Sequence, residues 1–294
     1  MSDFVQQQHT ICNFSNEESW VVLSPIEQNI KQKIESVGTP LKDWDIKIYR
    51  GVLTGYNDAF IISTEKRDEI LANCHTEDER LRTAELIRPI LRGRDIKRYG
   101  YDWANLWLIN THNGIKGVKP RIDINEYPAV KAHLDQYWDK ISKRADKGDT
   151  PYNLRNCAYL DDFSQPKVMY PNMTKYLPFY YDEKGFYQND KSFMITGKFV
   201  AYLTAFLNSS LFKYCYLNNF PELLGGTREL RKIFFDKIPV MVVNESINKQ
   251  IKTMLLDIQK EYTKSKAIAI DAMIFDLYKL SKEERELIGF VEIV

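Results

Sequence analysis

The stretch GVLTGYNDAFII, residues 51–62, and the stretch LIRPILRGRDIKRY, residues 86–99, carry most of the structural information in this chain of 294 residues. In the first stretch, Gly51 and Gly55 permit backbone angles that are closed to other residues, so they predict a tight loop. Tyr56 and Asn57 follow and offer a stacking ring and an amide, ahead of an apolar run that ends at Ile62. The pattern indicates a loop that presents polar groups to a partner.

The second stretch closes a strongly basic segment. Between Arg80 and Arg98 there are seven cations and two anions, a local balance of +5, whereas the whole chain has a formal net charge of +1. Such a block on a near-neutral protein is typical of a phosphate-binding surface, although a solvated helix face has the same composition. The local distribution of charge therefore predicts nucleic acid as a partner, which the overall charge does not.

Composition favours a folded protein without membrane spans. The hydrophobic fraction of 44% and the aromatic fraction of 13% argue against disorder. No segment approaches the roughly 18 uninterrupted apolar residues of a membrane helix, and the N-terminus lacks the pattern of a secretory signal. The length suffices for two domains, or for one large domain with an appendage. Four widely spaced cysteines predict reduced thiols in a cytoplasmic protein rather than a zinc site: Cys12, Cys74, Cys157 and Cys215.

Several motifs in a fixed order resemble the TaqI-like C-terminal specificity domain of Type IIG restriction-modification methyltransferases. The pattern G-x-x-T-G-x-N-x-A-F is met at residues 51–60, and L-R-G-R-D-I-K-R-Y is complete at residues 91–99. The resemblance covers about Trp20 to Glu284. Its further parts are Trp107–Ile109, Tyr202–Leu211, Gly225–Thr227, Ile238–Pro239 and Ile270–Glu284.

The resemblance implies an α+β fold, a mixed target-recognition domain with small sheets and loops flanked by helical segments. Residues 1–40 are then an N-terminal connecting segment with one helix, residues 41–240 the DNA target-recognition domain, and residues 241–294 a C-terminal helical segment. The implied function is sequence-specific recognition of double-stranded DNA, which positions the target for methylation of an adenine and for cleavage. Methyltransferase and nuclease domains, in cis or in trans, would be the protein partners, and S-adenosylmethionine and magnesium would belong to them.

Residues for catalysis are not recognisable in this chain. It has neither the N-P-P-Y type of tetrapeptide that grips a flipped base nor a glycine-rich loop for the methyl donor. The D-x-K triplets that begin at Asp45 and Asp95 lack nuclease context, and Ser209 and Ser210 are better explained as helix-boundary residues. Two rival functions stay open, a protein-protein interaction module that docks through its terminal helices and a small-molecule enzyme. The histidines show no metal-ligand spacing: His9, His75, His112 and His133.

Local signals predict the secondary structure. Ser24, Pro25 and Glu27 are typical of the start of a capped helix that Gly38 ends, and a second capping box is expected at Ser281. Residues 44–50 and 60–63 are expected to form the two strands of a hairpin. Helices are predicted for residues 77–88, 128–144 and 248–278, for residues from Thr196 onward, and from Ser209 or Ser210. Strands are predicted at 106–110, 168–171 and 186–188, and an irregular stretch at 218–228.

Five segments are candidates for DNA contact, because arginine pairs with guanine, amides pair with adenine, and cations bind phosphates. Each has a structural alternative, in order a plain hairpin turn, an internal salt-bridge cluster, solvated loop charges, a helix C-cap with its turn, and aromatic core packing. The candidate residues are Thr54, Tyr56 and Asn57 in the loop 54–58; Arg92, Arg94, Lys97 and Arg98 in 92–99; Lys116, Lys119 and Arg121 in 113–121; Thr227, Arg228 and Arg231 in 221–231; and Asn172, Thr174 and Lys175 in 170–181.

Overall fold

A four-stranded antiparallel sheet lies at the centre of the molecule. The computed structural model describes residues 23–292, so Cys12 and His9 lie outside the described residues. The strand order is β10 (Tyr180–Asp182), β8 (Lys167–Pro171), β12 (Ser192–Gly197) and β2 (Ile46–Arg50). Because side chains alternate along a strand, this sheet contributes to two cores: Ile195 of β12 packs in one and its neighbour Met194 in the other.

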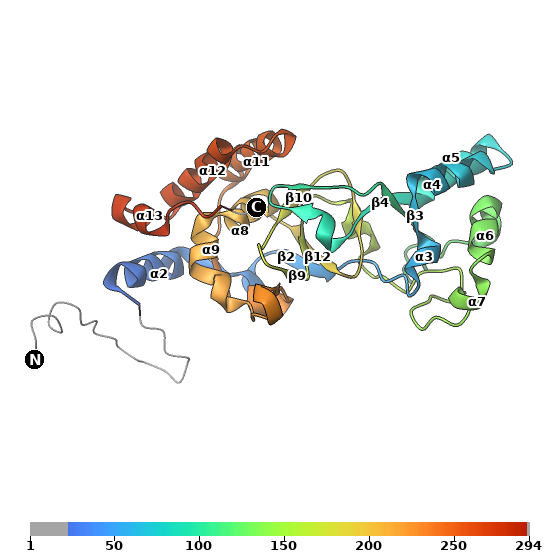
Figure 1. Ribbon diagram of the computed structural model, residues 1–294, viewed down its shortest axis with the longest axis horizontal. Helices are drawn as coiled ribbons and strands as arrows, with labels where there is room; N and C mark the ends of the chain where they lie inside the picture. Colours follow the sequence, from blue (N-terminus) through green and yellow to red (C-terminus); the bar gives the residue numbers. More distant parts are fainter. Residues whose placement is uncertain (1–22, 293–294) are drawn as a thin grey trace, which may run out of the picture.

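The first core lies between this sheet and a group of helices at one end of the molecule (Figure 1). Short strands β1 (Gly38–Pro40) and β14 (Pro239–Met241) pair, and the N-terminal helix lies beside β14, which leads into the C-terminal helices. The helices are α2 (Pro25–Val37), α8 (Val200–Asn208), α9 (Ser210–Tyr216), α11 (Glu245–Lys260), α12 (Lys264–Leu277) and α13 (Lys282–Ile288). Helix α11 packs on α8, and α12 packs on both α8 and α9.

The second core lies at the opposite end, around a mixed sheet (Figure 1). Its strand order is β11 (Tyr187–Gln188), β4 (Ile87–Leu91), β7 (Leu106–Ile109) and β3 (Ile61–Ser63), and only the β11–β4 pair is parallel. The helices of this end are α3 (Asn57–Phe60), α4 (Thr64–Ala72), α5 (Glu77–Leu86), α6 (Pro128–Asp135) and α7 (Trp138–Ile141).

Two small two-stranded sheets complete the fold. Strands β5 (Ile96–Lys97) and β6 (Gly100–Tyr101) pair as a tight hairpin, and β9 (Met173–Thr174) pairs with the distant β13 (Arg228–Glu229). Within residues 23–292, no helix has both the length and the apolar character that a membrane span needs. The remaining elements are α10 (Lys232–Phe235) and the 3₁₀ turns η1 (Leu41–Asp43), η2 (Gly93–Asp95), η3 (Ile124–Glu126), η4 (Leu160–Ser164), η5 (Leu217–Asn219) and η6 (Leu224–Gly226).

The expected α+β class is confirmed, and so are the signals at helix ends. Ser24 and Glu27 form a reciprocal capping box at the start of α2, and Ser281 and Glu284 form another at α13. The hydroxyl of Ser209 accepts a hydrogen bond from the Phe212 backbone amide and caps α9. These predictions succeed because a cap depends only on residues within one helical turn.

Four expectations for the secondary structure are wrong. Strands β2 and β3 do not form a hairpin, because β2 pairs with β12 and β3 pairs with β7. Helix α5 ends at Leu86, and Pro89 lies inside strand β4. Thr196 belongs to strand β12, and the following helix begins only at Val200. The helix expected over residues 128–144 is broken between α6 and α7.

Candidate nucleic-acid interface

The first glycine loop is fixed at its base and open at its tip. A Cβ at Gly51 would overlap the carbonyl oxygens of Gln188 and Asn189, so glycine alone permits this approach of two chain segments. Gly55 has a φ of 67°, in the left-handed region that favours glycine. Asn57 is exposed, whereas Thr54 is buried and its hydroxyl lies 2.5 Å from the amide oxygen of Asn57. The loop can therefore present the Asn57 amide in a fixed position.

Arg144 connects this loop to the neighbouring ones. It is buried, its guanidinium carbon lies 4.3 Å from the centre of the Phe60 ring, and burial lowers its pKa to about 10. The side chain remains charged at neutral pH, and carbonyl dipoles rather than a carboxylate accept from its two terminal nitrogens. The acceptors are the carbonyl oxygens of Thr54, Asp146 (2.8 Å), Pro151 (3.1 Å) and Asn153 (2.5 Å).

The loop 113–121 forms one wall of an open groove of about 870 Å³. Gly114 and Gly117 both have positive φ, and the chain closes on itself through a 2.8 Å hydrogen bond from the Ile115 amide to the Lys119 carbonyl. The opposite wall includes Asp149, Asn156, Cys157 and Ala158. The groove is therefore lined by charged and amide side chains together with apolar ones such as Ile115 and Val118.

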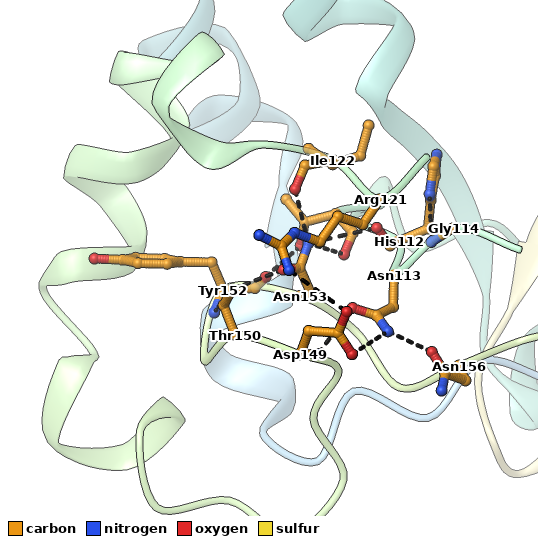
Figure 2. Close-up of polar contacts among 11 residues, drawn as sticks. His112, Asn113, Gly114, Arg121, Ile122, Asp149, Thr150, Tyr152, Asn153 and Asn156 are labelled. Atoms are coloured by element: carbon orange, nitrogen blue, oxygen red, sulfur yellow. Dashed lines mark hydrogen bonds and ion pairs between the residues drawn. The ribbon is translucent and has the colours of Figure 1, made fainter. Parts of the chain in front are cut away.

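A network of amides holds this groove in shape (Figure 2). The Asn113 side chain donates to Asp149 (3.0 Å) and to Asn156, and its oxygen accepts from the Asp149 backbone amide at 2.8 Å. Arg121 reaches the same carboxylate, with 3.4 Å between Nη1 and Oδ2. The buried Asn153 amide donates to the Ile122 carbonyl at 2.9 Å. The third candidate loop is thus attached to the segment 149–156 and, through Arg144, to the first loop.

The basic motif of residues 91–99 divides into buried and exposed cations. Arg92 forms a bidentate pair with the buried Asp95, with nitrogen–oxygen distances of 2.8–3.2 Å. Arg98 is only 7% exposed, and it donates to the Asn208 carbonyl at 2.9 Å and to the Val291 carbonyl at 3.3 Å. Arg94 and Lys97 are exposed. The guanidinium groups of Arg92 and Arg98 are bonded inside the molecule, which favours the internal alternative for these two residues, and their contact with phosphates stays a prediction.

The segments around residues 172 and 228 come together. Strand β9 pairs with β13, so Thr174 lies opposite Arg228. A second groove, of about 540 Å³, lies between the β9 segment and the basic motif, and Arg94, Lys97, Met173 and Thr174 line it. This groove brings the second and fifth candidate segments together, and the β9–β13 pair attaches the fourth segment to the fifth.

Ion pairing separates the candidate cations further. Four exposed cations pair with carboxylates: Lys97 at 3.5 Å, Lys119 at 3.7 Å, Arg121 at 3.4 Å and Arg231 at 2.8 Å. Such surface ion pairs contribute little to stability, so phosphates can replace the carboxylates. Arg228 is mostly buried and pairs with Glu222 at 3.0 Å. Within residues 23–292, no carboxylate pairs with the three remaining exposed cations, which are Arg94, Lys116 and Lys175.

Sequence reasoning missed Asn113, Arg144 and Asn153, which hold the loops in place. Arg144 was placed at the end of an expected helix, and nothing in its neighbours marks a buried arginine. The repeated amides of residues 149–156 were the available signal, because asparagine side chains commonly brace turns.

Burial favours the neutral forms of a histidine and of three cysteine thiols. Burial lowers the pKa of His112, and its neutral Nδ1 accepts the Gly114 amide at 3.1 Å. Burial raises the pKa of the Cys157 thiol to about 11 and that of Cys215 to about 12, and it also raises the pKa of Cys74. Neither the histidines nor the acidic residues between positions 23 and 292 form a group that could hold a metal ion.

A family model and solved structures both match this chain. The model of the TaqI-like C-terminal specificity domain matches residues 88–240. The chain is similar to the Type IIL restriction-modification enzyme MmeI, solved in complex with DNA, with a TM-score of 0.57 and 13% identity over 85% of this chain and 35% of that chain. It is also similar to the type IIG restriction endonuclease BpuSI, with a TM-score of 0.52 and 14% identity over 87% and 33%.

At these identities, the likeness to the solved structures is one of fold. The chain spans about a third of the length of each of them. A comparison with curated proteins found no match.

Proposed function

Since the chain belongs to the family of TaqI-like C-terminal specificity domains, we propose that it binds double-stranded DNA in a sequence-specific manner and holds the target for a restriction-modification enzyme. The observation that carries the proposal is the family match over residues 88–240, which includes four of the five candidate segments. The exposed cations Arg94, Lys116 and Lys175 support it, since no carboxylate of residues 23–292 pairs with them and they can contact phosphates.

Methylation and cleavage would be carried out by domains outside this chain, in cis or in trans. S-adenosylmethionine and magnesium would bind to those domains. The chain's own part would be to place the duplex, with phosphate contacts that set its position and base contacts that select its sequence.

The rival function, docking through the terminal helices, has less support. The buried faces of α11 and α12 pack against α8 and α9 within the first core. Those apolar faces are therefore occupied within the chain itself.

Salt-dependent binding of a random duplex tests the phosphate contacts. The full chain should bind with an affinity that falls as salt rises, and the slope of log K against log salt should be about −0.9 for each phosphate contact. The triple variant R94A/K116A/K175A should have a shallower slope. The matched control K42A/K249A/K260A removes three other exposed lysines and should bind as the wild type does. Binding that ignores salt, or equal effects of the two triple variants, would count against the proposal.

Selection from a pool of random duplexes tests the base contacts. The wild-type chain should enrich a defined sequence, and N57A should relax one position of it, because a good base contact is worth roughly 1–3 kcal/mol of discrimination. If N57A weakens binding equally on every duplex, then Asn57 is a general contact and not a base-reading residue.

A further inference from the structure

Leu224 stands at the tip of the loop 221–227 with its side chain 100% exposed. The next two residues, Gly225 and Gly226, have φ values of 75° and 76°, a pair that defines a tight turn and that glycine adopts most readily. No atom lies within 4 Å of a Cβ built at either glycine. The backbone conformation therefore favours glycine at these two positions, and lack of space does not. The turn holds the apolar side chain of Leu224 away from the protein surface.

The base of this loop is well held. The Leu223 amide donates to the Thr227 carbonyl at 2.6 Å, and Glu222 and Arg228 form a bridge between the two arms. The Arg228 guanidinium donates to the Phe220 carbonyl at 2.8 Å and to Glu222 at 3.0 Å. A fixed base beneath an exposed tip is the geometry of a wedge and not that of a loosely tethered loop.

The surroundings of the tip are apolar and basic together. Through the β9–β13 pair the loop adjoins a segment in which Met173 and Tyr176 are exposed, at 56% and 54%. Lys175 and Arg231 lie on the same two segments and are also exposed. A duplex offers phosphates to the cations and, at an unstacked step, base faces to the apolar groups, whereas an apolar protein surface would match the apolar groups alone.

We propose that Leu224 is an apolar wedge that inserts between base pairs of the duplex bound by this chain. The inference rests on the proposed DNA binding and adds a residue that distorts the target. Proteins that insert leucine or similar side chains between base steps unstack them and bend the DNA, which exposes a chosen base pair. In this arrangement Arg228 is a positioning residue, because its hydrogen bonds hold the base of the loop that carries Leu224. The nearby exposed cations would contact the phosphate backbone of the DNA.

The test compares a random duplex with the same duplex that carries one abasic site, since a wedge enters a gap without the cost of unstacking. The wild-type chain should bind the abasic duplex roughly tenfold more tightly, the gain expected when a leucine side chain leaves water. L224A should lose this preference and keep its affinity for the intact duplex. L224F should keep the preference. The control I268A shortens another exposed apolar side chain, on α12, and should behave as the wild type.

The outcomes separate the wedge from DNA binding itself. If the chain binds neither duplex, the proposed function fails and the wedge fails with it. If it binds both duplexes equally, or if L224A retains the preference, DNA binding stands and the wedge is overturned, which would leave the tip to contact a protein domain. Equal melting temperatures of wild type and L224A would show that the fold is unaffected.

Discussion

A single buried arginine couples two of the candidate loops. Arg144 donates hydrogen bonds to carbonyl oxygens of the first glycine loop and of the segment that braces the groove of residues 113–121. Its planar fork can meet four carbonyls at once, which the single ammonium of lysine cannot do. The position of Asn57 on one loop and that of Arg121 beside the other thus depend on the same side chain.

We expect Arg144→Lys to lower the free energy of unfolding by roughly 2–4 kcal/mol, because buried carbonyls lose their donors. Urea unfolding followed by circular dichroism measures the change. Arg155→Lys is the matched control, since Arg155 is exposed and makes an ion pair at 3.0 Å with Asp146, and it should change stability by less than about 0.5 kcal/mol. Equal stability of R144K and wild type would contradict the bracing role.

A buried histidine makes stability depend on pH. Burial lowers the pKa of His133, whose Nε2 lies 3.0 Å from the Ala59 carbonyl and whose Nδ1 is buried without a hydrogen bond. Lys66 lowers this pKa further, while Glu69 opposes the shift. The unfolded chain then binds a proton more readily than the folded chain, so stability falls as pH drops below the ordinary histidine pKa toward the lower folded value.

The prediction is that His133→Gln reduces the loss of melting temperature between about pH 7.5 and about pH 5.5. Glutamine keeps a donor for the Ala59 carbonyl and cannot be protonated. His75→Gln, a change at an exposed position, should leave the pH dependence as it is. An identical pH profile for H133Q and wild type would show that other groups determine the acid sensitivity.

At the scale of elements, the motif L-R-G-R-D-I-K-R-Y serves structure and surface at once. Arg98 and Tyr99 are the two residues between paired Lys97 and Gly100, and both face inward. Arg98 joins this turn to the end of α8 and to the C-terminal tail, while Arg94 faces the groove.

Single substitutions should separate these two roles. Arg98→Ala should cost roughly 2–3 kcal/mol of stability, because the Asn208 and Val291 carbonyls lose a charged donor. Arg94→Ala should leave the melting curve unchanged and weaken binding to every duplex. Thermal melting and duplex affinity, measured on both variants, check this. The assignment of separate roles is wrong if R98A has the melting temperature of the wild type, or if the melting temperature of R94A is clearly lower.

How far the sequence predicts these elements depends on the range of the interaction. Capping boxes at Ser24 and Ser281 and the cap at Ser209 are local and were predicted. Strand pairing is not local: the short apolar segments at 46–50 and 61–63 carry no mark of their distant partners β12 and β7, so the expected hairpin was wrong.

The candidate site shows the same limit. The segments that carry it were found from glycines and charge, but composition does not reveal which cations turn inward. Arg92 differs from Arg94 by a local pair with Asp95, three residues along the chain, whereas Arg98 turns inward through distant contacts that its neighbours in sequence do not mark. The contact of each residue with DNA and the boundaries at residues 40 and 240 stay predictions.

At the scale of the whole molecule, the C-terminal helices belong to the core of the recognition fold. Ile251, Leu255 and Ile274 are fully or almost fully buried in the first core with residues of α8. Polar contacts add to this packing: the carboxylate of Asp271 accepts from the Ser210 hydroxyl at 2.5 Å and from its backbone amide at 2.9 Å. The helices are therefore expected to be required for folding as well as for any docking.

Removal of residues 245–294 should abolish cooperative folding of the remainder. Five or more buried aliphatic side chains leave the first core, a loss on the order of 10 kcal/mol, which is comparable to the entire stability of a typical domain. Circular dichroism melting and limited proteolysis of the shortened chain measure the result. Leu255→Asp in the full chain should also prevent folding, because it buries a charge in the first core. The control Lys249→Asp, on the exposed face of α11, should fold like the wild type. A shortened chain that melts sharply and still binds duplex would instead make these helices a dispensable docking segment, because a core that survives without them cannot depend on their burial.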